Sequence, residues 1–371
     1  KKENVSVVAD LYLLFLSTPR KDLKADTIIL NNSKTSKMVI VGLGMGDEGK
    51  GLTTSWLCSQ TKNPLVVRFN GGHQAGHTVV YEGKHHVFSG FGSGSLQGVP
   101  TYWSEYCTFY PCSFLREFKL LDNPVIYVNP LCPVTTPFDI DFNRSSEKVK
   151  KHGSVGMGFG ATLQRQEDYY KLFVQDLYVE SVLIAKLEGI AKYYKAENAK
   201  EEIEYFVESV REVKNIIKLS NNSIMKVYNP IFEGAQGVLL DMDFGFFPNV
   251  TRSNTTSKNA LSLHPSQEVY YVTRSYLTRH GNGYLPNEKK LNLINNENET
   301  NVFNEFQKDF KVAPLNYDLI NRGLRYDKLF SDFCEKNIVV TCLDQVEDFR
   351  FKLSEVNTEF FKMYESHSQD S

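Results

Sequence analysis

The chain has 371 residues, of which 41% are hydrophobic and 23% are charged, and its formal net charge is −2 at pH 7. This length suffices for one large domain or two modest ones with a buried core. The nearly balanced charge disfavours a general binder of nucleic acid or of acidic membranes. The six cysteines include no C-x-x-C pair and no histidine cluster accompanies them, so we expect reduced thiols in a cytoplasmic small-molecule enzyme.

Residues 1–37 form the first segment of the chain. The stretch VSVVADLYLLFLSTP weakly resembles a secretion signal, but Asp10 interrupts it and the apolar run is too short to span a bilayer. Met38 opens the strand-like run MVIVGLGMG. We therefore expect residues 1–37 to be an extension or leader and residues 38–371 to be a single domain.

The run Met38–Leu43 is compact and apolar and ends in glycines, which predicts a buried parallel strand feeding a loop. Leu52–Gln60 predicts a helix whose N-terminus faces that loop, an arrangement that attracts anions. The loop GLGMGDEGKG nearly matches the phosphate-binding pattern G-x-x-x-x-G-K-[ST]. Gly51 stands where the hydroxyl that holds magnesium is expected, and Asp47 adds a carboxylate to the loop.

Pro64–Asn70 predicts a second strand, and the glycine-rich stretch NGGHQAGHT follows directly at its end. Loops at the carboxyl ends of parallel strands are where open α/β sheets bind ligands. His73 and His77 offer acid/base groups in this loop. A lone histidine would usually be structural, but two in one glycine loop favour catalysis for at least one of them.

The remaining pattern predicts an α/β fold around a mostly parallel sheet, with a helical excursion in the middle and a polar, mobile loop at Leu291–Asn304. The long helical periodicity covers Leu172–Ile217. Further strands are expected at Pro124–Asn129, Val227–Glu233, Val269–Tyr276 and Ile338–Leu343.

Two more glycine-rich segments, GSVGMGFGAT and FEGAQGVLLDMDFGFFPNVTRSNTT, add serine, threonine and glutamine to the candidate site. A surface loop, or a buried strand with a polar turn, would also explain each of them. Four such loops in one chain nevertheless favour a site for two phosphorylated ligands, with Asp47 as a base near a transferring phosphoryl group.

The motifs GDEGKG, FNGGHQAGHT, FEGAQGVLLDMDFGFFPNVTRSNTT and TRHGNGYLP, in this order, resemble the adenylosuccinate synthetase family from about Met38 to Asp344. The resemblance implies an α/β fold with a mostly parallel central sheet and a P-loop-like nucleotide site. It also implies a ligase that joins L-aspartate to C6 of a 6-oxopurine nucleotide, with nucleoside triphosphate hydrolysis and through a 6-phosphoryl intermediate.

The resemblance also implies roles for individual residues. Asp47 would take the N1 proton, His77 would hydrogen-bond the transferring phosphoryl group as an acid, and Lys50 would neutralise phosphate charge. Mg²⁺ would be held by Asp47 and the Gly76 carbonyl. The implied nucleotide-binding residues are Gly46, Asp47, Glu48, Gly49, Lys50, Gly51, Leu52, Gly76, His77, Thr78 and Asp344. The implied purine monophosphate-binding residues are Asp47, Gln74, Ser154, Val155, Gln236 and Thr251.

Two substitutions depart from the family pattern around the nucleotides. Cys342 replaces the lysine of the T-K-x-D motif that packs on the donor base, so ATP or dATP becomes a credible donor besides GTP. Ser55 stands where bacterial members carry an aspartate close to the purine pocket. A smaller, neutral group there could leave space for a 2-amino substituent.

The aspartate-binding segment also departs from the family. Its counterpart at Asn304–Pro314 offers only Lys308 and Lys311 where the family uses arginines, and lysine does not replace bidentate arginine equally. Arg322 and Arg325 are further candidates. Arg165 is the nearest match to the arginine that reaches across the dimer in bacterial relatives.

These departures and the short C-terminal segment YESHSQDS resemble the viral, archaeal-type branch, whose members condense dGMP with aspartate for 2-aminoadenine DNA. We therefore favour dGMP over IMP as the acceptor, in a bacteriophage enzyme acting as a homodimer in the host cytoplasm, without nucleic-acid or membrane partners. The alternatives are an ordinary synthetase using IMP and GTP, an inactive nucleotide-binding sensor, and a P-loop kinase or GTPase. Gly51 disfavours the last of these.

Overall fold

The computed structural model describes residues 37–150, 153–288, 291–294 and 310–368. The expected extension at residues 1–37, apart from its last residue, and most of the loop predicted at Leu291–Asn304 lie outside these residues. Within the described part, no helix combines the length and the apolar character needed to cross a bilayer.

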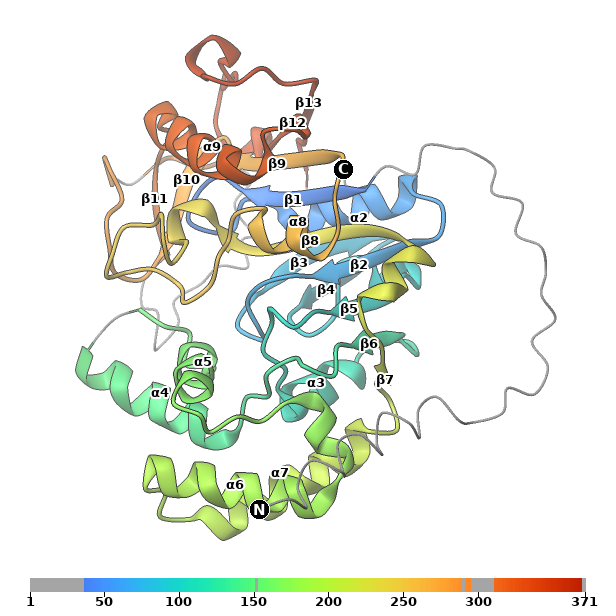
Figure 1. Cartoon of the computed structure of the whole chain (residues 1–371). Coiled ribbons are helices and arrows are strands. Elements are labelled where there is room, and N and C mark those ends of the chain that lie inside the picture. Colours follow the sequence, from blue (N-terminus) through green and yellow to red (C-terminus); the bar gives the residue numbers. More distant parts are fainter. Residues whose placement is uncertain (1–36, 151–152, 289–290, 295–309, 369–371) are drawn as a thin grey trace, which may run out of the picture. The chain divides into compact units, whose positions relative to one another are not determined.

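A parallel sheet of nine strands dominates the described residues (Figure 1), and its strand order is β13-β12-β9-β1-β8-β2-β5-β6-β7. The strands are β1 Met38–Gly42, β2 Pro64–Arg68, β5 Thr101–Trp103, β6 Ile126–Val128, β7 Lys218–Leu219, β8 Asn229–Gly237, β9 Glu268–Arg274, β12 Glu335–Thr341 and β13 Lys362–Glu365. Every paired neighbour runs parallel. The predicted α/β fold with a mostly parallel sheet is confirmed.

Two antiparallel hairpins accompany the sheet, and the sequence did not predict them. They are β3 His77–Tyr81 with β4 Lys84–Phe88, and β10 Tyr276–His280 with β11 Phe310–Pro314. The predicted strand Val269–Tyr276 therefore ends earlier, at Arg274, and its last residue begins β10.

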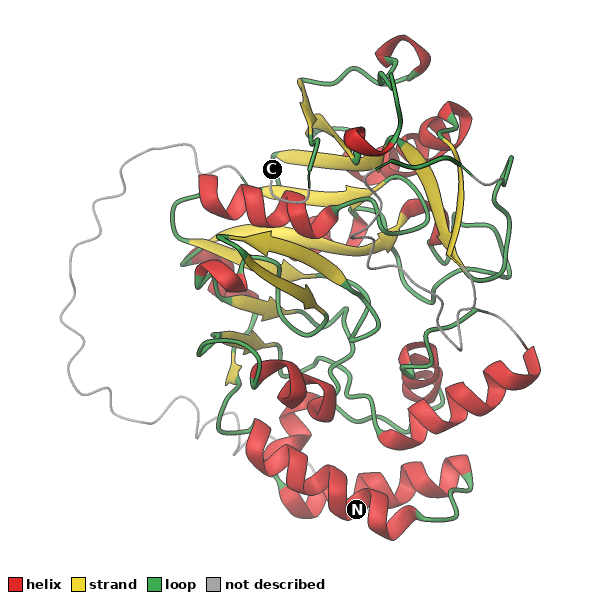
Figure 2. Cartoon of the chain, turned by 180° about the vertical axis from the view of Figure 1, so that it is seen from behind, coloured by secondary structure: helices red, strands yellow, loops and turns green. Residues whose placement is uncertain are grey.

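Helices, red in Figure 2, cover both faces of the sheet, whose strands are yellow. The helices of the described residues are α2 Lys50–Gln60, α3 Pro111–Phe118, α4 Pro137–Lys150, α5 Phe159–Glu167, α6 Glu180–Tyr194, α7 Ala199–Val213, α8 Lys258–Leu263 and α9 Tyr317–Ser331. Alternate residues of β1 serve the two faces: Val39 and Val41 pack with α8 and α9, and Ile40 packs with α2. Burial on both faces explains why β1 is apolar throughout.

The predicted helical excursion is confirmed, and the chain breaks it into α6 and α7 after a short 3₁₀ turn at Val174–Tyr178. These helices share a second apolar core with α3 and with the start of α4, to which Phe138, Leu187 and Phe206 contribute. Figure 1 shows α4 to α7 gathered on one side of the large sheet. The excursion thus packs on a core that it shares with β5 and β6, apart from the core around β1.

Candidate functional site

The loop between β1 and α2 turns through left-handed backbone conformations at Gly46 (φ 103°), Asp47 (φ 63°) and Gly49 (φ 93°). Glycine adopts such angles without strain, and aspartate is among the few other residues that tolerate them. The loop therefore brings the N-terminus of α2, which carries the positive end of the helix dipole, to a large cavity. This part of the molecule is built to attract anions.

Glu48 shapes this loop from beneath. Its carboxylate accepts hydrogen bonds from the amides of Gly44 (3.0 Å) and Gly46 (2.8 Å) and from the ammonium group of Lys50. Glu48 is only 3% exposed and is not on the cavity wall. A direct contact between Glu48 and a nucleotide stays a prediction. Its side chain stabilises the loop through these three hydrogen bonds.

The structure explains the glycine after Lys50. A Cβ atom at Gly51 would lie 2.8 Å from Cβ of His77 and 3.0 Å from Oγ of Ser93. The space that serine or threonine fills in an ordinary phosphate-binding loop is therefore occupied by β3 and by the segment after β4. Gly51 is needed because a histidine packs directly against the start of α2.

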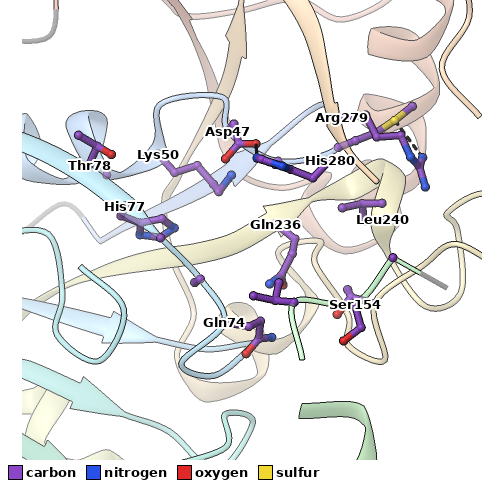
Figure 3. A pocket seen from close by; sticks show the side chains of 18 of the residues that line it. Asp47, Lys50, Gln74, His77, Thr78, Ser154, Gln236, Leu240, Arg279 and His280 are labelled. Atoms are coloured by element: carbon purple, nitrogen blue, oxygen red, sulfur yellow. Dashed lines mark hydrogen bonds and ion pairs between the residues drawn. The ribbon is translucent and has the colours of Figure 1, made fainter. Parts of the chain in front are cut away.

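Asp47 lies on the cavity wall beside β10. Its Oδ2 atom is 3.2 Å from Nε2 of His280, as Figure 3 shows, and its backbone carbonyl accepts a hydrogen bond from Arg274. Burial raises the pKa of Asp47, but the hydrogen bond and charge of His280, followed by the charges of Arg274 and Lys50, together lower it below its ordinary value. The carboxylate is thus kept ionised.

His77 begins β3 and lies on the wall of the same cavity. Its Nδ1 atom is 2.8 Å from Oε1 of Glu233, a fully buried residue of β8. Burial lowers the pKa of His77, although the negative charge of Glu233 acts in the opposite direction. An anion entering the cavity would also favour the protonated ring.

The other histidine of this loop has a different environment. His73 stacks on Trp103 with ring centroids 4.8 Å apart, and it is not among the residues that line the cavity. Burial lowers the pKa of His73 to about 3. The sequence predicted a catalytic role for at least one of the pair, and the geometry favours His77.

One cavity of about 910 Å³ collects nearly all the residues that the sequence singled out. Figure 3 shows Gln74, Gln236 and Ser154 around the same space as Asp47, Lys50 and His77. The predicted residues on its wall are Gly46, Asp47, Gly49, Lys50, Gly51, Leu52, Gln74, Gly76, His77, Thr78, Ser154, Val155, Gln236, Thr251 and Asp344. Cys342 also lines it, as do Ser366 and Ser368 of the C-terminal segment.

The cavity offers oxygen donors for one magnesium ion. Asp47 and Gly76 both lie on its wall, and no group of three or more His, Cys, Asp or Glu side chains among the described residues is arranged to hold a metal. Mg²⁺ is commonly bound by one or two carboxylates together with substrate phosphates. The residues present therefore fit a metal that a nucleotide helps to hold.

None of the described residues that we expected to bind aspartate lies on the cavity wall. Lys308 is outside the described residues, and Lys311 pairs with Glu288 at 3.0 Å, away from the cavity wall. Arg322 and Arg325 line a separate, shallow pocket. Arg322 lies there between the rings of Phe246 and Tyr326. Neither arginine lies on the wall of the large cavity, and their part in binding aspartate stays a prediction.

The expectations for Arg165 and Ser55 are wrong. Arg165 cannot reach across a dimer, because it is fully buried and its Nε donates to Asp139 at 2.9 Å within the same chain. Ser55 is buried on α2, where Gln97 donates to its hydroxyl at 2.8 Å, and it is not on the cavity wall. It therefore cannot leave space for a substituent on a purine in this cavity.

Sequence reasoning missed several residues of the site. Arg274, Arg279 and His280 line the cavity, and two of them belong to the motif TRHGNGYLP, which was recognised without assigning roles to its members. Glu233 was missed although a carboxylate inside the apolar strand β8 is a signal of a buried partner.

Comparison with known proteins finds a matching family and several relatives of this chain. The family profile described as adenylosuccinate synthetase matches residues 39–311. The adenylosuccinate synthetase of Thermoplasma volcanium is 33% identical over 286 residues, which cover 70% of this chain and 64% of that protein. That of Bordetella avium is 30% identical over 283 residues, covering 68% and 65%. That of Picrophilus torridus is 31% identical over 338 residues, covering 82% and 76%. The match thus spans slightly less than two thirds of the first two relatives.

Two solved structures share the fold. The fully ligated adenylosuccinate synthetase from Plasmodium falciparum superposes with a TM-score of 0.71 at 21% identity, over 83% of this chain and 77% of that one. The cyanophage S-2L succinoaminodeoxyadenylate synthetase, bound to dGMP and dATP, gives a TM-score of 0.62 at 14% identity, over 90% and 93%. At these identities the likeness is one of fold.

Proposed function

The chain belongs to the adenylosuccinate synthetase family, and from that premise we propose that it joins L-aspartate to C6 of a 6-oxopurine nucleoside monophosphate with hydrolysis of a nucleoside triphosphate. One observation carries the proposal. Loops that follow β1, β2, β8 and β12, far apart in the sequence, meet around a single cavity, and Asp47, Lys50 and His77 lie on its wall.

The proposed chemistry follows from the poor leaving ability of the C6 oxygen, which is phosphorylated before the amine of aspartate displaces it. Asp47, kept ionised by its neighbours, would accept the N1 proton and make the oxygen nucleophilic. His77 would donate a hydrogen bond to the transferring phosphoryl group. Each acid/base group would contribute about 10²- to 10⁴-fold to the rate, and Lys50 would neutralise phosphate charge.

Asp47 and the Gly76 carbonyl would hold Mg²⁺ together with phosphate oxygens, since both lie on the cavity wall. When bound, the ion would neutralise negative charge on the phosphates. The purine monophosphate would contact Gln74 and Gln236 near its base, and Ser154 and Thr251 near its 5′-phosphate.

We favour dGMP as the acceptor and ATP or dATP as the donor. Cys342 lies on the cavity wall near Asp344, where the family's lysine would pack on the donor base. The cyanophage enzyme of the same fold is bound to dGMP and dATP. IMP with GTP is the second candidate, because the relatives at 30–33% identity are named adenylosuccinate synthetases. The argument from Ser55 no longer supports dGMP. A homodimer stays a prediction.

The test incubates the full chain with ATP, dATP or GTP, with Mg²⁺, L-aspartate and either dGMP or IMP, and follows phosphate release. Aspartate-dependent release with dGMP alone would support our preference, and release with IMP alone would replace it with the second candidate. Release without aspartate would indicate a GTPase or ATPase, and nucleotide binding without release would indicate a sensor. Either of these two results would refute a ligase.

A further inference from the structure

The buried carboxylate of Glu233 lies directly behind His77. It is fully buried on β8 and accepts from three donors: Nδ1 of His77 at 2.8 Å, the amide of Ser93 at 3.3 Å, and the hydroxyl of Ser93. No other residue of the candidate site touches this carboxylate among the described hydrogen bonds. The arrangement joins β8, β3 and the segment after β4 behind the cavity wall.

The ionisation of Glu233 decides which nitrogen of His77 carries a hydrogen. Burial raises the pKa of Glu233, but the charge and hydrogen bond of His77, with the charge of the buried Arg68 and the bond from Ser93, lower it below its ordinary value. An ionised carboxylate can only accept hydrogen bonds. Nδ1 of His77 must therefore carry a hydrogen, and Nε2 is left for a ligand in the cavity (Figure 3).

We propose that Glu233, held in place by Ser93, is a positioning residue for His77: it fixes the ring, commits Nδ1 as a donor and favours the protonated ring, in which Nε2 also carries a hydrogen that it can donate to the phosphoryl group. The proposal rests on the proposed function and deepens it. A carboxylate that orients a functional histidine is a recurring device in enzymes. Glu233 itself does not reach the cavity wall.

A purely structural explanation would make Glu233 the counterion of Arg68, which is also buried. The contacts disfavour this explanation. Among the described residues Arg68 forms no ion pair with Glu233. Its Nη1 donates at 3.4 Å to the carbonyls of Ser89 and Phe91, and its guanidinium lies 5.6 Å from the ring centre of Trp103. The direct partners of Glu233 are His77 and Ser93.

A double-mutant cycle separates positioning from structure. Glu233→Gln keeps the volume and removes the charge, and we expect it to lower kcat for aspartate-dependent phosphate release by about 10- to 100-fold, as removal of the partner that orients a metal-binding histidine does. The KM for nucleotide should change little. In a His77→Ala background the same change should have no further effect. Equal losses in both backgrounds, or no loss in either, would overturn the proposal.

Glu117→Gln is the matched control. Glu117 is another buried carboxylate, which accepts from the hydroxyl of Ser89 (2.8 Å) and its amide (3.1 Å), and it does not line the cavity. This variant should lose stability but keep its kcat. A fall in kcat equal to that of Glu233→Gln would show that any buried charge near β3 has the same effect, and would overturn the proposal.

A second readout needs no turnover. Nitrogen-15 NMR of histidine-labelled full chain, with the His77 signals assigned by their absence in His77→Ala, should show a hydrogen on Nδ1 that is protected from exchange. Glu233→Gln should weaken that protection, and Glu117→Gln should not. A neutral His77 with its hydrogen on Nε2 would overturn the proposal. If the wild type shows no aspartate-dependent turnover, the proposed function fails, while this measurement still tests the orientation of His77.

Discussion

The loops that follow the parallel strands differ from the helical excursion, taken together with the preceding helix α5 as Phe159–Val213, in how far they depart from ordinary local structure. Three non-glycine residues on the cavity wall have left-handed backbones: Asp47 (φ 63°), Gln236 (φ 57°) and Cys342 (φ 57°). Such conformations cost about 1–3 kcal/mol each and cluster at functional sites. Buried charges, among them Lys50 and Glu233, accompany them.

The excursion follows local rules instead. Its left-handed residues Tyr169 and Lys195 lie at or just after helix ends, where helices commonly stop in this way. Its apolar positions face a shared core. The strained residues of the cavity wall therefore lie where we place the chemistry, whereas the buried ion pair of Arg165 and Asp139 lies away from that wall. Changes in the loops should alter turnover, and changes in the excursion should alter stability.

The strongest test of the loop region is Asp47→Asn. We expect turnover to fall by about 10²- to 10⁴-fold, because the amide can neither accept the N1 proton nor hold a metal as a carboxylate does. The fold should remain, since asparagine tolerates a left-handed backbone well. Phosphate release and a urea melt measure the two effects. The control is Asp243→Asn, whose carboxylate lies 3.8 Å from Lys258 on the surface; a near-normal rate for Asp47→Asn would refute its assigned role.

Within the excursion, Arg165→Ala should have the largest effect. The change leaves Asp139 as a buried carboxylate without its cation, and breaking such a pair costs about 3–5 kcal/mol. Turnover per folded molecule should persist. Urea unfolding checks the expectation, with Lys200→Ala as the control, because that lysine is exposed. Full stability with lost turnover would restore Arg165 as a residue of the active site.

Much of the fold follows from local sequence. Apolar runs that end in glycine, such as Met38–Leu43, correctly predicted the central strands, and the periodicity of Leu172–Ile217 predicted helices. The short strands β5, β7 and β13 were missed, because two to four residues show no clear period. The position of β1 between β8 and β9 joins residues that are far apart in the chain, so no local pattern could give it.

The site was predictable where motifs follow strands, because the carboxyl ends of parallel strands share one edge of the sheet. It was not predictable where a role depends on the direction of a side chain. Arg165 and Ser55 have suitable positions in the sequence but turn into the core. His280 was missed for a related reason: its contact with Asp47 joins β10 to a loop more than two hundred residues earlier in the chain.

The pH dependence of stability tests whether the buried histidine His73 has a structural role or a role in acid/base chemistry. Burial lowers the pKa of His73 from 6.5 to about 3. The unfolded chain therefore binds a proton below about pH 6.5 that the folded chain refuses, so stability falls as the pH falls through this window. From pH 7 to 5 this histidine should account for about 2 kcal/mol.

Urea melts of His73→Phe, which keeps the stacking on Trp103, should show a shallower loss of stability on acidification than the wild type. The exposed residue His85 provides the control, and His85→Phe should keep the wild-type slope. An unchanged slope in His73→Phe would mean that His73 takes up its proton at the same pH in the folded and unfolded chains, and would reopen a role for it in acid/base chemistry.

The smallest expected effect comes from adding one methyl group to a glycine in each region. Gly189 lies inside α6 with nothing within 4 Å of an added Cβ atom, and alanine is more favourable than glycine in a helix. Gly189→Ala should raise stability by about 0.5–1 kcal/mol and leave turnover unchanged. Gly51→Ala makes the same chemical change where the new atom would lie 2.8 Å from His77, so it should displace that ring and lower turnover. If the two variants behave alike in urea melts and in phosphate release, then the loops do not differ from the excursion in their effect on turnover and stability.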